Sequence, residues 1–131
     1  MNLKRIVLLF ISFVCMVQVN AQEVAVHISQ DGILKVCKQR ENRIHDCESR
    51  RKNVKFAVIN ADQTLIAIVY KDGKLEICKL RGTDIEPGIY EKENVASVEF
   101  GLQNTLMVTF NDNKMEYCEL HERRLHHCRP R

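Results

Sequence analysis

The segment KDGKLEICK, from Lys71 to Lys79, decides the fold because it occurs in three related copies along the chain. QDGILKVCK begins at Gln30 and NDNKMEYCE begins at Asn111, so the cysteines of the three copies lie 41 and then 40 residues apart. In each copy an Asp-Gly or Asp-Asn pair separates two runs rich in β-branched and aromatic residues. Such pairs tolerate the positive φ angles of a tight turn, so each copy predicts a two-residue β-hairpin.

The repetition extends upstream of these hairpins. NVKFAVINADQTLIAIVYKDG, starting at Asn53, parallels NVASVEFGLQNTLMVTFNDN, starting at Asn94. Both predict a strand, a turn, a second strand and the hairpin turn, and after each cysteine the chain turns back toward a fourth strand. TLIAIVY, from Thr64 to Tyr70, is apolar at successive positions, which predicts a strand buried between two layers. The fold expected is all-β, built from antiparallel four-stranded hairpin repeats stacked in one small disulfide-stapled domain.

VKFAVINADQTLIAIVYKDGKLEICKL and VASVEFGLQNTLMVTFNDNKMEYCEL resemble WD-like β-propeller blades in their order of strands and turns. The Gly-His and Trp-Asp signatures of that family are missing, and a cysteine stands in place of the late-strand aromatic residue. A truncated first unit and two whole ones are fewer than the four to eight blades of a closed propeller. Two arrangements stay open: a compact stack within one chain, which is favoured, or subunits that assemble a larger ring. Chance hairpin spacing would explain the repeat without either, and a helix is an alternative only in residues 38–53 and 121–127.

The first residues indicate the compartment. Lys4 and Arg5 precede a mostly apolar run, and the small residues Val19 and Ala21 favour cleavage before Gln22. We therefore expect a secretory signal peptide at 1–21 and one domain at 22–131, with repeats at about 22–52, 53–93 and 94–131. An uncleaved anchor is the alternative, although the run is shorter than a membrane span. The mature protein is expected to be secreted and extracellular, with no transmembrane anchor.

Removal of residues 1–21 lowers the formal net charge from +3 to +1, because that segment holds two basic residues and no acidic one. The mature chain then lacks the overall basic character of a nucleic-acid-binding protein. It also loses Cys15 and keeps five of the six cysteines. Cysteines pair by default in an oxidising compartment, so an odd number leaves one thiol free or paired between chains.

Two segments share a C-x9-C pattern: CKQRENRIHDC, from Cys37 to Cys47, and CELHERRLHHC, from Cys118 to Cys128. A hairpin centred on residue 42, or on residue 123, would place the two cysteines of each segment opposite each other. A helix would hold them roughly 15 Å apart, too far for a bridge. We therefore predict two disulfides, each contributing about 2–3 kcal/mol to stability.

The middle repeat departs from this pattern, since Gly88 and not a cysteine lies ten residues after Cys78. Cys78 is therefore the odd cysteine, and Ala67 is expected to face it across the hairpin and leave room for it. A buried free thiol is the favoured interpretation. An interchain disulfide giving a covalent homodimer comes second, and a reactive nucleophile comes last because no local motif activates the thiol.

No metal site and no cofactor are predicted. His121 and His126 lie inside the second cysteine pair, but the first pair contains only His45, so no ligand set is repeated. Cysteines in a disulfide are also unavailable to a metal ion. Exposed histidines beside a disulfide are therefore the favoured interpretation, and a zinc or copper site is the lesser alternative.

The sequence contains no phosphate-binding glycine loop, nucleophile elbow or HExxH motif, so no enzymatic activity is expected. Basic residues gather in two clusters, which form a candidate surface for an anionic partner: Arg50, Arg51, Lys52, Lys55, Arg123, Arg124, Arg129 and Arg131. The plainer interpretation is a solvated surface balanced by neighbouring carboxylates. As partners we expect an extracellular protein, a receptor or an anionic glycan, and not nucleic acid.

Together these features favour a secreted, non-enzymatic binding protein or extracellular effector that acts through protein or receptor contacts. Short secreted chains of this kind include toxin-like venom components. The alternative is a lectin-like module that binds carbohydrates or sulfated glycans. A structural or matrix protein assembled through Cys78 is a third class.

Overall fold

A computed structural model describes residues 23–131, and every regular element in that part of the chain is a β-strand. The first sheet contains β1 (Glu23–Ile28), β2 (Leu34–Arg40) and β3 (Arg43–Arg51). The second contains β4 (Val54–Ile59), β5 (Leu65–Tyr70), β6 (Leu75–Arg81), β7 (Asp84–Ile85) and β8 (Ile89–Lys92). The third contains β9 (Val95–Phe100), β10 (Thr105–Phe110), β11 (Met115–His121) and β12 (Arg124–Pro130).

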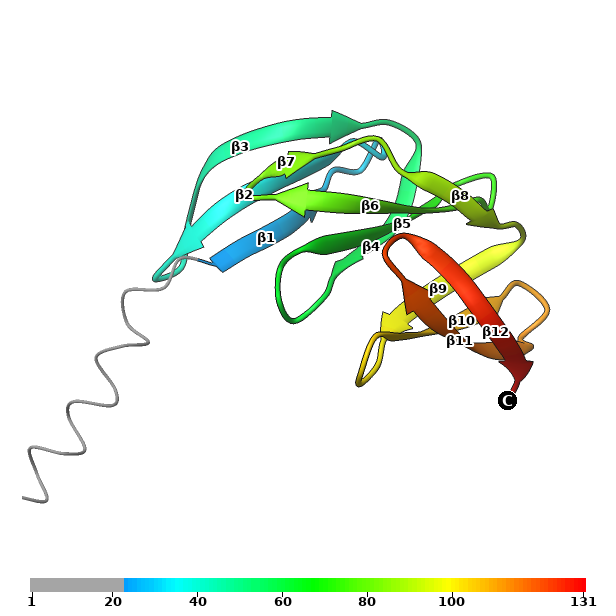
Figure 1. The fold of residues 1–131 in the computed structure, drawn as a ribbon. Coiled ribbons are helices and arrows are strands. Elements are labelled where there is room, and N and C mark those ends of the chain that lie inside the picture. Colours follow the sequence, from blue (N-terminus) through cyan, green and yellow to red (C-terminus); the bar gives the residue numbers. More distant parts are fainter. Residues whose placement is uncertain (1–22) are drawn as a thin grey trace, which may run out of the picture.

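The predicted all-β fold class is confirmed, since all strand pairs are antiparallel and the sheets lie side by side (Figure 1). The sheets form an open stack and not a closed propeller. The helical alternative for 38–53 and 121–127 is wrong, because those residues form the β2–β3 and β11–β12 hairpins. The predicted signal peptide at 1–21 lies outside the described residues. Among residues 23–131, no helix is long and apolar enough to cross a membrane.

The middle sheet is buried on both faces, which explains the uninterrupted apolar run around β5. Ile66 and Ile68 pack against the first sheet, in a cluster with Leu34 and Val36. Their neighbours along the strand point the other way and join a second cluster with the third sheet, made of Ala67, Val69, Leu75, Ile77, Val95, Val98, Leu106, Val108 and Leu120. Alternation along β5 therefore separates two apolar faces, and each face requires a neighbouring sheet.

The same backbone contact joins each sheet to the next. The amide of Val54 donates to the carbonyl of Gly32 at 2.9 Å, and the amide of Val95 donates to the carbonyl of Gly73 at 2.9 Å. Both acceptors lie in hairpin turns at positive φ, and both donors begin the following sheet. Gly73 is also needed for space, because a Cβ there would lie 3.1 Å from the Cα and the amide nitrogen of Asn94. The hairpin turns thus serve as attachment points between sheets.

Both C-x9-C segments form hairpins, but they do so with a bulge that the expected symmetric hairpin lacks. In the first, Arg40 pairs with Arg43 across a two-residue turn, which alone would place Cys37 opposite residue 46. Asp46 has a φ of +50° and adds one residue to β3, and this extra residue brings Cys47 opposite Cys37. His127, with a φ of +50°, does the same for the Cys118–Cys128 pair. Each hairpin is therefore centred half a residue before its predicted position, and the bulge restores the alignment of the two cysteines.

We expect Gly73→Ala to lower the free energy of unfolding by about 2–4 kcal/mol, because the Cβ meets both the positive φ and the backbone of Asn94. Asn113 is the matched control, since it occupies the same turn position in the third sheet at a φ of +73°. Asn113→Ala should cost only about 1 kcal/mol, the cost of the backbone conformation alone. Urea unfolding of both variants measures the difference. Equal losses would show that contact with the next sheet does not constrain Gly73.

Candidate functional site

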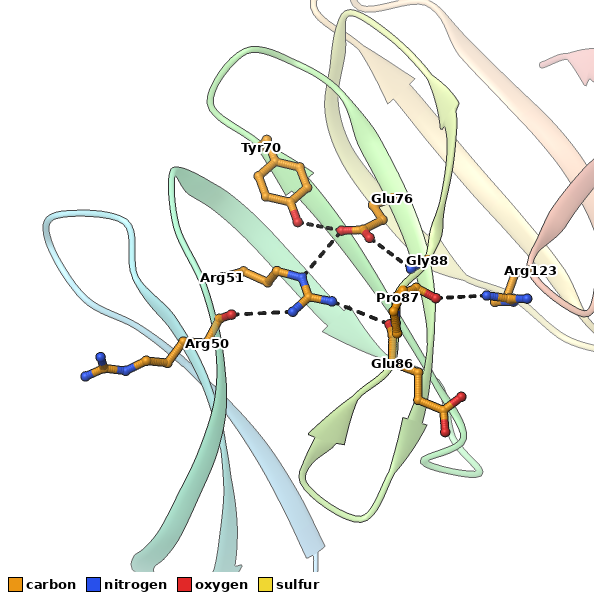
Figure 2. Close-up of polar contacts among 8 residues, drawn as sticks. All are labelled: Arg50, Arg51, Tyr70, Glu76, Glu86, Pro87, Gly88 and Arg123. Carbon is orange, nitrogen blue, oxygen red and sulfur yellow. Dashed lines mark hydrogen bonds and ion pairs between the residues drawn. The ribbon is translucent and has the colours of Figure 1, made fainter.

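The middle sheet has Cys78 and Gly88 at the positions that form a disulfide in the other two sheets, and a buried polar cluster lies beside them (Figure 2). Glu76 on β6 is 4% exposed, and its carboxylate accepts hydrogen bonds from the Tyr70 hydroxyl at 2.5 Å and from the Gly88 amide at 3.0 Å. The Nε atom of Arg51, at the end of β3, lies 3.7 Å from the same carboxylate. A buried carboxylate is tolerated where donors and an opposite charge surround it, as they do here.

The surroundings of this cluster raise the pKa values of Tyr70 and Arg51. Burial, followed by the hydrogen bond to Glu76, raises the pKa of the Tyr70 phenol above its usual range. Burial lowers the pKa of the Arg51 guanidinium, but the Glu76 carboxylate and further neighbours outweigh this and leave that pKa raised. Arg51 therefore stays charged, Tyr70 stays protonated, and the cluster holds one compensated ion pair.

Two arginines of the predicted anionic-partner surface instead hold the β7–β8 segment in place. Arg51, from the first sheet, donates to the carbonyl of Glu86 at 3.4 Å. Arg123, from the third sheet, donates to the carbonyl of Pro87 at 2.8 Å. Figure 2 shows the two side chains reaching this segment from opposite sides. Their role in this geometry is to link neighbouring sheets.

The remaining basic residues do not form one surface. Those that are exposed are Arg50, Lys52, Lys55, Arg124, Arg129 and Arg131. The first three lie near the β3–β4 connection, which Figure 1 places far from the C-terminus that carries the last two. Arg131 also donates to the Sδ atom of Met107 at 3.2 Å. The predicted surface is therefore divided between the junction of the first two sheets and the third sheet.

A hollow beside the β3–β4 connection gathers cations that the sequence analysis did not place together. It has a volume of about 480 Å³ and is lined by Lys52, Asn53, Tyr70, Lys71, Asp72, Lys74 and Tyr90. Its three lysines and Tyr90 are exposed, and the two tyrosine rings lie 6.1 Å apart at 44°. Only Lys52 was among the predicted site residues. The others come from the β3–β4 connection, the end of β5, the β5–β6 turn and β8. The pairing of β8 with β6 includes a register shift that no sequence pattern indicates.

The third sheet has a hollow at the equivalent place with the opposite charge. It is lined by Glu93, Asn94, Phe110, Asn111, Asp112, Lys114, Met115, Glu116 and Pro130. Three carboxylates and one lysine thus replace the three lysines and one carboxylate of the middle sheet. The hollow itself follows from the repeated fold, whereas its charge is particular to each unit.

Both predicted cysteine pairs are bonded within the chain, Cys37 to Cys47 and Cys118 to Cys128, each with a Cα–Cα distance of 4.0 Å. Glu116 has a carboxylate oxygen close to the second pair, but the two sulfurs are not available as metal ligands because they bond to each other. Cys78 is free and fully buried.

Cys78 faces a different residue from the one expected. Across the β5–β6 hairpin it pairs with Ile66, and Ala67 pairs with Ile77, because the hairpin register places Val69 opposite Leu75. Room for the thiol comes from Gly88 on the other side, where a Cβ would lie 2.5 Å from the Cys78 Sγ atom. Burial, reinforced by the charge of Glu76, raises the pKa of the Cys78 thiol to about 12. A protonated thiol without exposed surface favours the free-thiol interpretation over an interchain disulfide.

Comparisons of the chain with protein-family models, with curated proteins and with solved structures find no match. The geometry of the described residues therefore has to carry the functional conclusion.

We expect the Cys78 thiol of the oxidised mature protein to react very slowly with a thiol reagent even at about pH 10, where an unperturbed thiol is already ionised. A pKa of about 12 keeps Cys78 protonated there, and burial blocks the reagent. After unfolding in guanidinium chloride, one thiol per chain should react at once. Non-reducing electrophoresis should give a monomer band. Fast labelling of the native protein, or a dimer band, would contradict the buried free thiol.

We expect Gly88→Ala to be strongly destabilising, by about 2–4 kcal/mol, because its Cβ would lie 2.5 Å from both the Cys78 Sγ atom and the carbonyl oxygen of Ile77. Gly82→Ala is the control, since a Cβ at Gly82 meets nothing within 4 Å and only its φ of +64° is unfavourable. That variant should lose about 1 kcal/mol. Thermal unfolding at neutral pH compares the two, and similar losses would show that the space opposite Cys78 is not restrictive.

Proposed function

We propose that the protein is a secreted, non-enzymatic binding protein, an extracellular effector of toxin-like size, that acts by contact with an acidic segment of another protein or receptor. The observation that carries this proposal is the hollow that brings together Lys52, Lys71 and Lys74. Three exposed ammonium groups around one hollow attract an anionic partner and raise its rate of association.

The composition of the hollow supports a partner that is acidic and partly apolar. Asp72 is its single carboxylate, and one of its oxygens already accepts the backbone amide of Lys74 at 3.1 Å. Tyr90 is 59% exposed and offers an aromatic surface of the kind that recurs at protein interfaces. Arg50, whose side chain points away from the buried cluster in Figure 2, adds a further exposed cation near the same connection.

A sulfated glycan is the second candidate partner, and the tyrosine pair is the observation that favours it. The Tyr70 and Tyr90 rings are tilted by 44° and lie next to three lysines, so sugar rings and sulfate groups could be bound together. In this case the protein would be a lectin-like module. The two candidates differ in whether binding depends on the identity of the sugar or on the presence of a polypeptide.

Secretion is supported by the two intramolecular disulfides, because such bonds persist in oxidising compartments. The predicted signal peptide at 1–21 is part of the same proposal. The absence of catalysis is supported by the state of Cys78, since a buried thiol with a pKa of about 12 is a poor nucleophile. The proposal takes the protein as a monomer and not as a homodimer linked through Cys78.

We expect the oxidised mature protein, immobilised on a sensor surface, to bind poly-glutamate and heparin, and binding should weaken steeply as salt is raised. The triple variant Lys52→Ala, Lys71→Ala and Lys74→Ala should weaken binding by at least about tenfold, since it removes all three ammonium groups of the hollow. Lys114→Ala is the matched control, because Lys114 occupies the position of Lys74 in the acidic hollow of the third sheet. It should have little effect.

The choice of probe separates the two candidates. Binding that survives high salt and distinguishes among glycans on an array favours the lectin-like module, whereas binding of acidic polypeptides over heparin favours the effector. If neither probe binds, or if Lys114→Ala weakens binding as much as the triple variant, the hollow is not the site.

A further inference from the structure

The β11–β12 hairpin gathers four side chains with metal-binding chemistry on one face. Glu119 pairs with His126 across the two strands, so the two side chains project from the same face. His121 lies two residues after Glu119 on the same strand and therefore shares that face as well. His127 would normally face the other way, but it is the bulge residue, and its imidazole lies on the same side as the other three.

Two donor–donor separations, both from Glu119, are close to those that one metal ion requires, although no three of these donors lie within 4.8 Å of one another, so the imidazoles have to rotate inward to complete a site. The Oε1 atom of Glu119 lies 3.5 Å from the Nδ1 atom of His127 and 3.7 Å from the Nε2 atom of His121. Ligands at about 2.0–2.2 Å from a tetrahedral zinc ion lie roughly 3.3 Å from each other. The ring of His126 is next to both, with centroids 4.9 Å from His121 and 6.4 Å from His127.

These side chains are also free to move onto an ion. His121 is 62% exposed, His127 is 70% exposed and Glu119 is 47% exposed, so small rotations can bring the two imidazoles around an ion beside Glu119. The backbone beneath them is fixed by the Cys118–Cys128 disulfide, which holds β11 against β12. A preformed backbone with mobile donor groups reduces the ordering that binding must impose.

We propose that Glu119, His121, His126 and His127 form a binding site for a divalent transition-metal ion, Zn²⁺ or Cu²⁺. Imidazole and carboxylate donors suit both ions, and Cu²⁺ is expected to bind more tightly. The sequence analysis predicted no metal because the first hairpin does not repeat the histidines and because cysteines in a disulfide are not available as ligands. This site uses none of them, so the disulfide and the metal are compatible.

The first C-x9-C hairpin provides an internal contrast. At the positions of the four donors it has Lys38, Arg40, His45 and Asp46, and a lysine and an arginine cannot serve as ligands for a metal ion at neutral pH. Its single histidine, His45, pairs across the strands with Lys38, and its Nδ1 atom lies 3.1 Å from the carboxylate of the neighbouring Asp46. The same hairpin with the same bulge therefore lacks the site, and the donor set is particular to the third sheet.

The test is isothermal titration of ZnCl₂ and, separately, of CuCl₂ into the untagged, oxidised mature protein. We expect one ion bound per chain and a higher melting temperature in its presence. His121→Ala, His127→Ala and Glu119→Gln should each weaken binding by at least about tenfold, since the first two remove an imidazole and the third replaces an anionic carboxylate with a neutral, weakly binding amide. His45→Ala is the matched control, because it removes an exposed histidine from the hairpin without the site. It should leave the affinity unchanged.

A spectroscopic measurement keeps the proposal testable if a variant is unstable. The electron paramagnetic resonance spectrum of the Cu²⁺-loaded wild-type protein should show hyperfine coupling to at least two imidazole nitrogens. Absence of this coupling, absence of saturable uptake, or an equal loss of affinity in His45→Ala would overturn the proposal. The triple lysine variant of the hollow should bind metal with unchanged affinity. Failure of the metal site would therefore leave the proposed function untouched, and failure of the proposed function would leave the metal site untouched.

Discussion

Sheet β4–β8 has two apolar faces and cannot be stable with either of them in water. Ile66 and Ile68 point to one side of β5, and Ala67 and Val69 point to the other, so each face needs a neighbouring sheet. The two outer sheets cover these faces. The carbonyls of Gly32 and Gly73 accept a hydrogen bond from the first residue of the following sheet and so fix where that sheet begins. The position of the lysine hollow depends on this arrangement, because its three lysines come from the connection between two sheets and from the next hairpin turn.

The middle sheet replaces a covalent bond with a polar cluster. The outer units close their last hairpin with a disulfide, whereas the middle unit has Cys78 opposite Gly88 and a buried carboxylate next to them. Glu76 binds Arg51 of the first sheet, and Arg123 of the third sheet binds the segment that ends at Gly88. The outer units thus have a disulfide that links two strands of one sheet, whereas the middle unit has polar contacts that link three sheets.

The sequence predicted the features that depend on neighbouring residues in the chain. The places of the turns, the antiparallel strands and the two C-x9-C hairpins follow from local residue preferences and from the repeat. The predicted two-residue turn at Asp72-Gly73 is wrong, because the Tyr70 amide donates to the carbonyl of Lys74 and leaves three residues in the turn. The bulges at Asp46 and His127 were missed because hairpins centred on residues 42 and 123 already place the cysteines opposite each other, so the spacing gave no sign of an extra residue. The partner of Cys78 was misplaced by one residue for a related reason, since register depends on the turn geometry. The hollow and the role of Arg51 require contacts between sheets, which no local pattern encodes.

The two disulfides lie in the two terminal sheets, and the sheet between them has none. A terminal sheet has one neighbour and the central sheet has two, so in a linear array of units the ends are the first to fray. A cross-link removes conformational freedom from the unfolded segment that it closes, and it therefore has most effect where packing is weakest. The covalent bonds are thus placed at the two ends of a one-dimensional array. A reducing environment would therefore loosen the two outer sheets first, and with them the cover over both apolar faces of the middle sheet.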